Sequence, residues 1–238
     1  PMPLLAIPGP KRRTKPLVAI GVLTRNRPQY LAECLRGLRD GMRTTVCDTR
    51  LMVWNNGSER IPEQTHGCGY NVGQHVSMNR LIQEASEVGA DWFLRVDEDC
   101  VFQTPRWLAK MLHIVTRHVA IYKRPCVLSP VVHGLRNPPQ SLGDMWMGKW
   151  HLQIVPILGG ICRLMPMSHL RYWRFDERMP MGFSAATSYA RYCMATGMPI
   201  LRCTNIEVSH GESTDAQEKA DPDWAYESEM VKMTPFGL

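Results

Sequence analysis

The sequence lacks any apolar run close to the roughly 20 residues that a membrane-spanning helix needs, so we expect no membrane span. It also lacks the pattern of a secretory signal peptide, because three prolines break its first eight residues and its basic cluster follows them. Eight cysteines are present, but none forms a C-x-x-C pair and most lie in apolar segments. This pattern favours buried, reduced thiols in a cytoplasmic protein over a disulfide framework or a zinc site.

The length of 238 residues is sufficient for one large domain with a substantial core. Hydrophobic residues make up 44% of the chain and charged residues 21%, which is typical of globular proteins. Four prolines in the first ten residues, followed by a basic cluster, predict that residues 1–16 form a flexible basic segment. No internal repeat and no clear linker divides residues 17–238, which we predict to be a single domain.

The positive charge is concentrated in one part of the chain. Residues 100–210 contain 13 Lys and Arg against 4 Asp and Glu, a net charge of +9, whereas residues 1–99 have a net charge of +2. Residues 211–238 are acidic, with a net charge of −5. A basic region of this size suggests an anionic partner, such as a diphosphate, an acidic glycan or nucleic acid. Arginines scattered over a solvated surface would give the same composition.

Strand and helix patterns alternate in the first hundred residues. Apolar runs at Leu17–Leu23, Leu51–Trp54 and Trp92–Val96 are typical of strands buried on both faces. Between them, apolar residues recur at helical spacing over Gln29–Arg39 and Val76–Val88. This β-α-β-α-β order predicts a Rossmann-like, mainly parallel sheet flanked by helices. Ligands of such sheets bind at the carboxyl ends of the strands.

Polar segments follow each of these three strands, at Thr24–Arg27, Asn55–Ser58 and Asp97–Asp99. The third has two carboxylates separated by one residue, so both project from the same face of a strand end. Such a pair can hold Mn²⁺ or Mg²⁺, and the cation can bind a diphosphate. A chain with 22 acidic residues also contains D-x-D by chance. The predicted convergence of all three segments at one sheet edge favours the metal site.

The second half is less regular. Residues 140–151 mix tryptophan, methionine and glycine without a clear period. The clearer patterns predict helices over Pro105–His118 and Ala185–Thr196. They also predict strands over Cys126–Val132, Pro199–Val208 and Ile154–Leu164, the last interrupted by Gly159–Gly160.

In their order, these motifs resemble those of the GT-A fold glycosyltransferases, particularly the family 2-like group that uses nucleotide-sugar donors. The resemblance covers residues 17 to about 212 and implies a nucleotide-sugar-binding half (17–103), an irregular acceptor half (104–212) and an acidic C-terminal segment (213–238). The matching motifs are Val18–Arg27, Val53–Ser58, Asn71 with Gly73 and Asn79, Asp97–Asp99, Gly159–Gly160, Phe175–Glu177, Arg191 with Gly197, and Val208–His210.

The resemblance also implies roles for individual residues. Donor binding falls to Thr24, Asn26, Asn55, Asn71, Gly73, Asn79 and Asp97. Asp97 and Asp99 would hold the metal, and His210 matches a position that often completes its coordination. The family usually has an acidic residue at Asn55, so the nucleobase of the donor stays open. An Asn-Gly pair is also a common turn, and a lone histidine is most often structural.

The chain departs from the family at the catalytic base. Inverting relatives have an acidic pair before the arginine that corresponds to Arg191, whereas this chain has Ser184–Thr187 there. Asp176 and Glu177 are the nearest carboxylates, and one of them is our candidate base. The two alternatives are an enzyme that retains configuration without such a base, and a catalytically inactive GT-A-like binding protein.

The acceptor stays open between several classes. Trp146, Trp150 and Trp173 near basic residues suggest a polyanion whose exposed base stacks on an aromatic ring. DNA with hydroxymethylated bases, the acceptor of some viral glycosyltransferases, would place the protein in the cytoplasm of a virus-infected host cell. An acidic glycan or a phosphorylated acceptor is the main alternative. A sugar-phosphate nucleotidyltransferase is disfavoured, because Thr24–Pro28 is not the Gly-rich loop that it needs.

Overall fold

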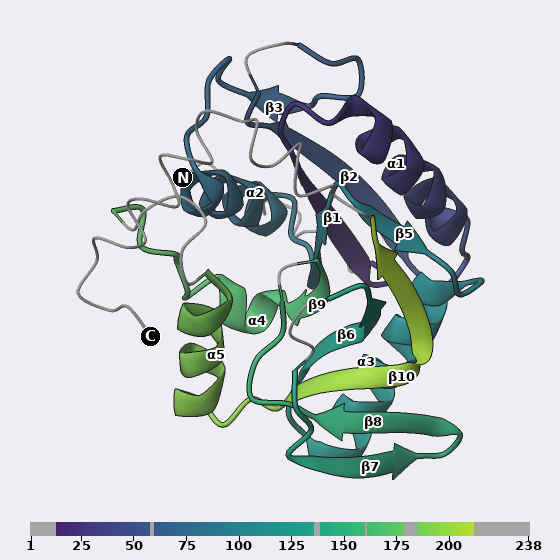
Figure 1. Ribbon diagram of the computed structural model, residues 1–238. Coiled ribbons are helices and arrows are strands. Elements are labelled where there is room, and N and C mark those ends of the chain that lie inside the picture. Colours follow the sequence, from purple (N-terminus) through teal and green to yellow (C-terminus); the bar gives the residue numbers. More distant parts are fainter. Residues whose placement is uncertain (1–12, 58–59, 136–138, 160, 179–184, 212–238) are drawn as a thin grey trace, which may run out of the picture.

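The computed structural model describes residues 13–57, 60–135, 139–159, 161–178 and 185–211. The predicted acidic segment 213–238 and most of the predicted segment 1–16 lie outside these residues, so both stay predictions. The described chain contains five helices and ten strands in a single sheet (Figure 1). The helices are α1 (Pro28–Met42), α2 (Gln74–Glu87), α3 (Trp107–Tyr122), α4 (Met167–Leu170) and α5 (Ala185–Ala195). The strands are β1 (Leu17–Thr24), β2 (Asp48–Asn55), β3 (His66–Gly67), β4 (Trp92–Asp97), β5 (Cys100–Phe102), β6 (Val127–His133), β7 (Gly143–Met147), β8 (Trp150–Ile154), β9 (Cys162–Pro166) and β10 (Ile200–His210).

The predicted α/β class is confirmed, and parallel pairs occur in both halves of the sheet, since β1 pairs with β2 and β4 and β6 pairs with β10. The strand order is β3-β2-β1-β4-β9-β6-β10-β8-β7, and β5 pairs with β10 outside this path. Strand β1 runs parallel to both β2 and β4, as the β-α-β-α-β pattern predicted. Strand β9, antiparallel to both neighbours, separates β4 from β6. The complete sheet is therefore mixed.

The irregular half contains the elements that the sequence failed to define. Only the two ends of the predicted interrupted strand Ile154–Leu164 lie in strands, because β8 ends at Ile154 and β9 begins at Cys162. Strands β7 and β8 form an antiparallel hairpin from the segment that has no clear sequence period. Its alternation was hidden because exposed and buried tryptophan and methionine residues lie next to each other in the hairpin.

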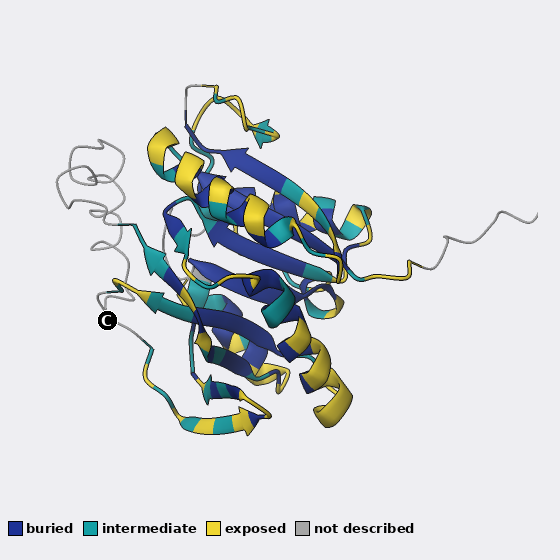
Figure 2. Cartoon of the chain, turned by 90° about the vertical axis from the view of Figure 1, so that its right-hand side faces the viewer, coloured by how far each residue is buried: buried dark blue, intermediate teal, exposed yellow. Residues whose placement is uncertain are grey.

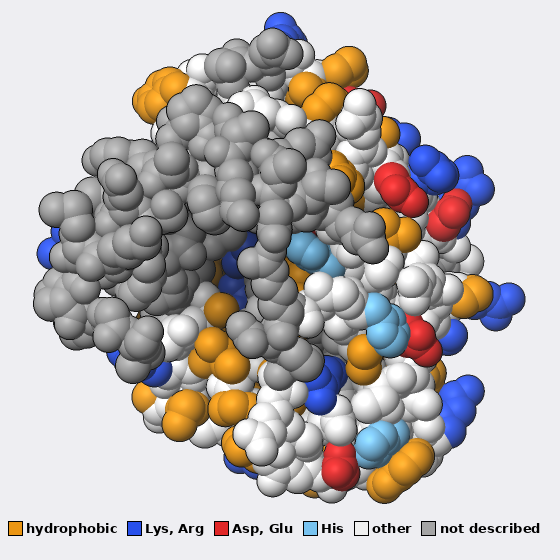
Figure 3. Space-filling model, viewed as in Figure 1, with side chains coloured by type: hydrophobic (Ala, Val, Ile, Leu, Met, Phe, Trp, Pro, Cys, Tyr) orange, Lys and Arg blue, Asp and Glu red, His pale blue; other side chains and the backbone are white. Residues whose placement is uncertain are grey.

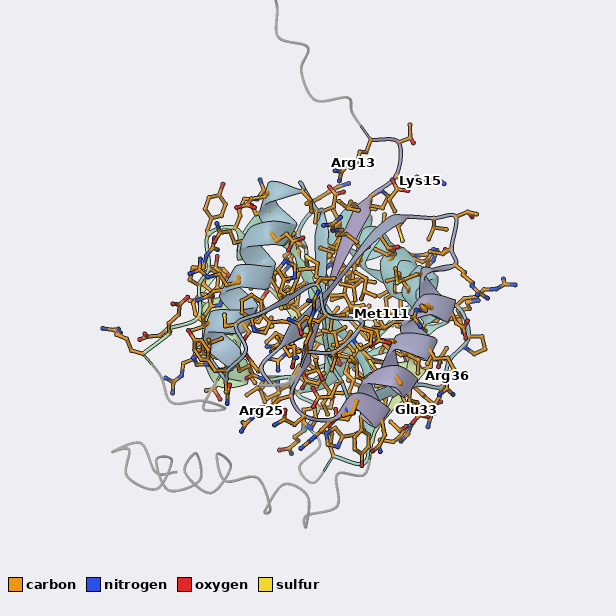
Figure 4. All side chains as sticks on the ribbon, turned by 90° about the horizontal axis from the view of Figure 1, so that it is seen from above. Arg13, Lys15, Arg25, Glu33, Arg36 and Met111 are labelled. Carbon is orange, nitrogen blue, oxygen red and sulfur yellow. The ribbon has the colours of Figure 1, made fainter. Side chains whose placement is uncertain are left out.

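Each face of the sheet has its own core. Helices α1 and α3 pack on one face, where their apolar side chains meet those of the inner strands. Helices α2, α4 and α5 pack on the other face, against Phe93, Met165 and Ile200. Figure 2 shows the central strands buried between exposed helix surfaces. In the view from above, Glu33 and Arg36 lie on the outer side of α1, whereas Met111 of α3 lies in the interior (Figure 4).

Seven of the eight cysteines are buried, as predicted for most of them, and Cys68 is exposed. Burial raises the pKa of Cys126 to about 12, so its thiol is protonated at neutral pH.

None of the helices in the described ranges is long and apolar enough to cross a lipid bilayer.

A glycine in the central strand allows a close approach between β1 and its neighbour. A Cβ on Gly21 would lie 2.6 Å from the Phe93 ring. We therefore expect Gly21→Ala to lower the free energy of unfolding by about 2 kcal/mol, because the ring must move within a packed core. Denaturant titration would measure this change. Gly143→Ala is the matched control in β7, since its Cβ would meet nothing within 4 Å. Equal unfolding midpoints for the two variants would contradict this packing.

Candidate functional site

The three polar segments predicted to converge do meet at one edge of the sheet. In the parallel register, Thr24 of β1 pairs with Asn55 of β2, and Leu23 pairs with Asp97 of β4. The backbone N–H of Asn56 donates a 2.8 Å hydrogen bond to the Thr24 carbonyl oxygen, which joins the first two segments. Thr24 and Asn55 are buried, whereas Asp97 is half-buried. The strand ends therefore form one continuous polar site.

The turn after β2 is built around Gly57. Asn55 Oδ1 accepts a 2.8 Å hydrogen bond from the Gly57 N–H, and Asn55 Nδ2 donates to Gln64 Oε1 at 3.1 Å. A Cβ on Gly57 would lie 2.5 Å from the Asn26 side-chain oxygen and 2.9 Å from that of Asn55. Asn26 itself has a φ of 54°, in the left-handed region. Two of the predicted donor-binding residues, Asn26 and Asn55, thus both lie against one glycine.

Asn56 connects this turn to α2, a role that the sequence reasoning missed. Its side-chain oxygen accepts hydrogen bonds from Trp54 Nε1 and Ser77 Oγ, both 2.9 Å long. At the start of α2, Asn71 Oδ1 accepts a 2.9 Å hydrogen bond from the N–H of Gly73, whose φ is 82°. Asn71 and Gly73 therefore shape the loop before α2, next to the strand ends.

Asn79, also predicted to bind the donor, is engaged with the chain around residue 175. Its Nδ2 donates to the Phe175 carbonyl oxygen and to Glu177 Oε1, both at 2.9 Å, and its Oδ1 accepts from the Phe175 N–H at 2.9 Å. His75 adds a second link, because its Nδ1 donates to the Asp176 carbonyl oxygen at 2.8 Å. Helix α2 thus fixes the segment that carries both candidate bases, which no sequence signal indicated.

The two candidate bases differ in their surroundings. Both carboxylate oxygens of Asp176 accept hydrogen bonds from the Arg178 guanidinium, at 2.9 and 2.8 Å. These bonds, with one from the Arg178 N–H, lower the pKa of Asp176 to about 2. A carboxylate with so low a pKa is a weak proton acceptor. Glu177 is exposed and receives its hydrogen bond from the neutral amide of Asn79.

The acidic segment after β4 is divided between two sets of partners. Arg95 lies two residues before Asp97 on the same strand face, and its Nε and Nη2 donate to Asp97 Oδ1 at 3.2 and 3.0 Å. Asp99 Oδ2 lies 3.1 Å from His210 Nε2 and 3.5 Å from Arg27 Nη1. Strand β10 therefore brings His210 to Asp99, although they are far apart in the sequence. Arg95 and Arg27 thus each contact one of the two aspartates.

Glu98, between the two aspartates, also lies near Arg27, with Oε1 3.8 Å from the guanidinium Nε. Burial, and then the charge of Asp99, raise the pKa of Glu98 well above its ordinary range. The acidic residues are thus crowded in a poorly solvated position.

One observation fits a cation here. Asp99 Oδ1 is buried and has no hydrogen-bond partner, which is costly for a carboxylate oxygen unless something else compensates it. Carboxylate oxygen and imidazole nitrogen are ligands that Mn²⁺ accepts. Within the described ranges, no three His, Cys, Asp or Glu side chains gather closely enough to hold a metal ion. Asp99 and His210 are brought together, while Asp97 is held by Arg95.

Two predicted features lie partly outside the described residues. Ser184, at the first position of the family's acidic pair, and Gly160 are both outside them. Helix α5 begins at Ala185, and Ala186 and Thr187 are half-buried in it.

No family model matches the sequence, and no curated protein sequence matches it. Solved structures do match, with probability 1.00. TarS from S. aureus is 14% identical with a TM-score of 0.60, over 90% of this chain and 42% of that one. GalNAc-T7 in complex with UDP, GalNAc and Mn²⁺ is 10% identical with a TM-score of 0.62, over 84% of this chain and 44% of that one. Mannosyltransferase PcManGT from Pyrobaculum calidifontis, in complex with GDP-Man and Mn²⁺, is 13% identical with a TM-score of 0.57. The match covers 86% of this chain and 59% of that one.

These neighbours are GT-A glycosyltransferases, and the chain has the GT-A fold. The resemblance predicted from the order of the motifs is thereby confirmed at the level of the fold. The chain spans less than half the length of TarS and GalNAc-T7.

Proposed function

We propose that the protein is a glycosyltransferase that moves a sugar from a nucleotide-sugar donor to a hydroxyl acceptor with the help of Mn²⁺ or Mg²⁺. The observation that carries this proposal is the buried, unpartnered Asp99 Oδ1 beside His210, at the edge where Thr24 and Asn55 end their strands. The GT-A fold supports it, since two neighbours were solved with Mn²⁺ and a nucleotide or nucleotide sugar.

Each part of the site has a role in this proposal. Asp99 and His210 hold the cation, and Asp97, neutralised by Arg95, lies toward the ribose with Thr24 and Asn55. When bound, the cation stabilises negative charge on the departing diphosphate. Asn26, Asn71 and Gly73 shape the donor pocket through the two loops that they order.

Glu177 is the base in our proposal, and Asn79 positions it. The acceptor hydroxyl oxygen forms the new bond to the anomeric carbon, while its proton passes to the Glu177 carboxylate. The bond between the anomeric carbon and the diphosphate oxygen breaks, and the nucleoside diphosphate leaves with the electron pair. Asp176 is the less suitable base, because Arg178 occupies both of its oxygens.

A donor screen tests this function directly. We expect the protein with Mn²⁺ to release nucleoside diphosphate from at least one member of a panel of UDP- and GDP-sugars, and EDTA to abolish the release. Mass spectrometry would identify the product. If no donor is hydrolysed and neither UDP nor GDP binds with Mn²⁺, the transferase proposal is wrong. Metal-dependent binding without turnover would support the inactive binding protein instead.

Within this proposal, the acceptor is one of the classes predicted from the sequence. A hydroxymethylated base in DNA and an acidic or phosphorylated acceptor both require a positively charged surface. The basic residues of 100–210 are spread over the molecule, since Lys110 and Arg117 lie on α3 and Arg163 is fully buried. Direct binding of DNA and of oligosaccharides separates the acceptor classes.

A further inference from the structure

One face of the sheet is open at its β7 end. On β7, β8 and β10, the side chains of Met147, Leu152 and Leu201 point into the core shared with α1 and α3. Alternation along the strands turns their neighbours to the opposite face. These are Asp144, Trp146, His151, Gln153, Arg202 and Thr204. At the position of β8 and β10, Figure 3 shows polar surface with histidine and acidic side chains, and none of the described helices lies in front of these strands in Figure 1.

Trp146 is the most conspicuous residue on this face. Its side chain is 67% exposed, although burying an indole is strongly favourable in water. The ring stacks on His151 from the paired strand, with 4.6 Å between ring centroids and 22° between planes. The other two candidate tryptophans differ, since Trp150 is buried and Trp173 is half-buried against Tyr192. Trp146 alone among the three presents its ring to solvent.

The histidine beneath this ring is fixed on both sides. His151 Nε2 lies 3.2 Å from Asp144 Oδ1, and its Nδ1 lies 3.0 Å from Thr204 Oγ1. Holding both ring nitrogens sets the plane of the imidazole, and stacking then sets the plane of the indole. Trp146 is thus a preorganised flat surface, which binds a ring with little loss of side-chain entropy.

A hydrogen-bonded pair and a small cavity lie between Trp146 and the candidate active site. Gln153 Oε1 accepts two hydrogen bonds from Arg202, at 2.9 and 2.6 Å. Arg202 and Ser129 then line a small cavity whose other walls are mostly apolar and include Ile161. The carbonyl oxygen of Ile161 accepts a 2.9 Å hydrogen bond from the Asp97 N–H, which places the far end of the cavity beside the acidic segment. Five strand spacings separate β7 from β4, or about 24 Å.

We propose that this face binds an oligosaccharide, with Trp146 as the stacking surface for one sugar ring. The inference rests on the proposed function, because the bound chain would be the acceptor whose end reaches the site at Asp97. Sugars present an apolar ring face to an aromatic side chain and hydroxyl groups that both donate and accept hydrogen bonds. The amide of Gln153, the guanidinium of Arg202 and the hydroxyl of Thr204 match those groups.

The charges on this face favour a glycan over nucleic acid. Nucleic acid sites combine aromatic rings with clustered Lys and Arg along the phosphate backbone. Here the side chain next to the Trp146 platform is the Asp144 carboxylate, and Arg202 is the one Lys or Arg among the six side chains named on this face. A phosphate backbone laid across Trp146 would meet the carboxylate of Asp144. Neutral hydroxyl groups meet no such repulsion.

Binding can be measured without any donor. We would titrate the protein with cello-, malto-, manno-, chito- and hyaluronan hexasaccharides and with a single-stranded DNA oligonucleotide, using calorimetry. At least one hexasaccharide should bind, and Trp146→Ala should weaken that binding about tenfold. Trp146→Phe should keep most of the affinity, because it keeps a flat ring.

Tyr172→Ala is the matched control, since Tyr172 is 80% exposed and follows α4. It should leave hexasaccharide binding unchanged. Absence of hexasaccharide binding, equal affinity of Trp146→Ala and the parent protein, or DNA binding that depends on Trp146 would each overturn the inference. UDP and GDP binding with Mn²⁺, measured in the same variants, separates the two proposals. Intact nucleotide binding without hexasaccharide binding overturns the glycan surface alone.

Discussion

Replacing Asp99 with asparagine is expected to reduce sugar transfer on the order of 10³-fold, the loss typical when charge stabilisation of a transition state is removed. The substitution keeps the shape of the side chain but removes the negative charge beside His210 and Arg27. Its Oδ1 is also the buried oxygen that has no protein partner. Rates of nucleoside diphosphate release, together with Mn²⁺ binding followed by electron paramagnetic resonance, would measure both effects.

Asp40→Asn is the control for the loss of one acidic charge. Asp40 is exposed on α1 and lies 3.8 Å from Arg43, away from the strand ends, so transfer should not change. Thermal unfolding would show whether Asp99→Asn is still folded. A folded Asp99→Asn protein with full activity and unchanged Mn²⁺ affinity would remove Asp99 from the metal site.

Replacing Glu177 with glutamine is expected to slow transfer to the acceptor by about 10²- to 10⁴-fold, the usual contribution of a general base. Glutamine can still accept the hydrogen bond from Asn79 Nδ2, so the segment fixed by α2 should keep its position. Donor binding should therefore be unchanged, and kcat should fall more than KM rises. Steady-state kinetics with the donor and acceptor found by screening would test this split.

Asp176→Asn distinguishes the two neighbouring carboxylates. Because Arg178 lowers the pKa of Asp176 to about 2, this side chain has little capacity to accept a proton, and its loss should cost little activity. The opposite ranking of the two variants would make Asp176 the base. If neither substitution slows transfer, this segment supplies no base, and an enzyme that retains configuration becomes the better description.

The sequence was most informative where local pattern and tertiary environment agree. Strand β1 is apolar throughout and is buried throughout, because it lies between two parallel neighbours and under helices on both faces. The alternation of strands and helices up to residue 97 sufficed to predict which polar segments share a sheet edge. The order of elements along the chain therefore suffices to bring Thr24, Asn55 and Asp97 together.

Side-chain pairing within the site could not be read in the same way. Asp97 and Asp99 look equivalent in the sequence. In the structure, however, Arg95 donates hydrogen bonds to Asp97, whereas His210 lies next to Asp99. The first pairing depends on strand alternation, and the second on where β10 ends. Asn79 was predicted to touch the donor. Its side-chain amide forms hydrogen bonds with the backbone of Phe175, almost one hundred residues further along the chain. Such contacts depend on the packing of whole elements.

The sequence by itself determined the α/β class, the GT-A resemblance and the sheet edge that carries the acidic segment, because each rests on period and order along the chain. Only the tertiary structure decided which groups are free to act. In the folded chain, the antiparallel strand β9 lies between β4 and β6. Arg178 donates hydrogen bonds to Asp176, and one carboxylate oxygen of Asp99 has no hydrogen-bond partner. It also exposed Trp146 and buried Trp150, since register and the packing of α3 fix which face of a hairpin meets water.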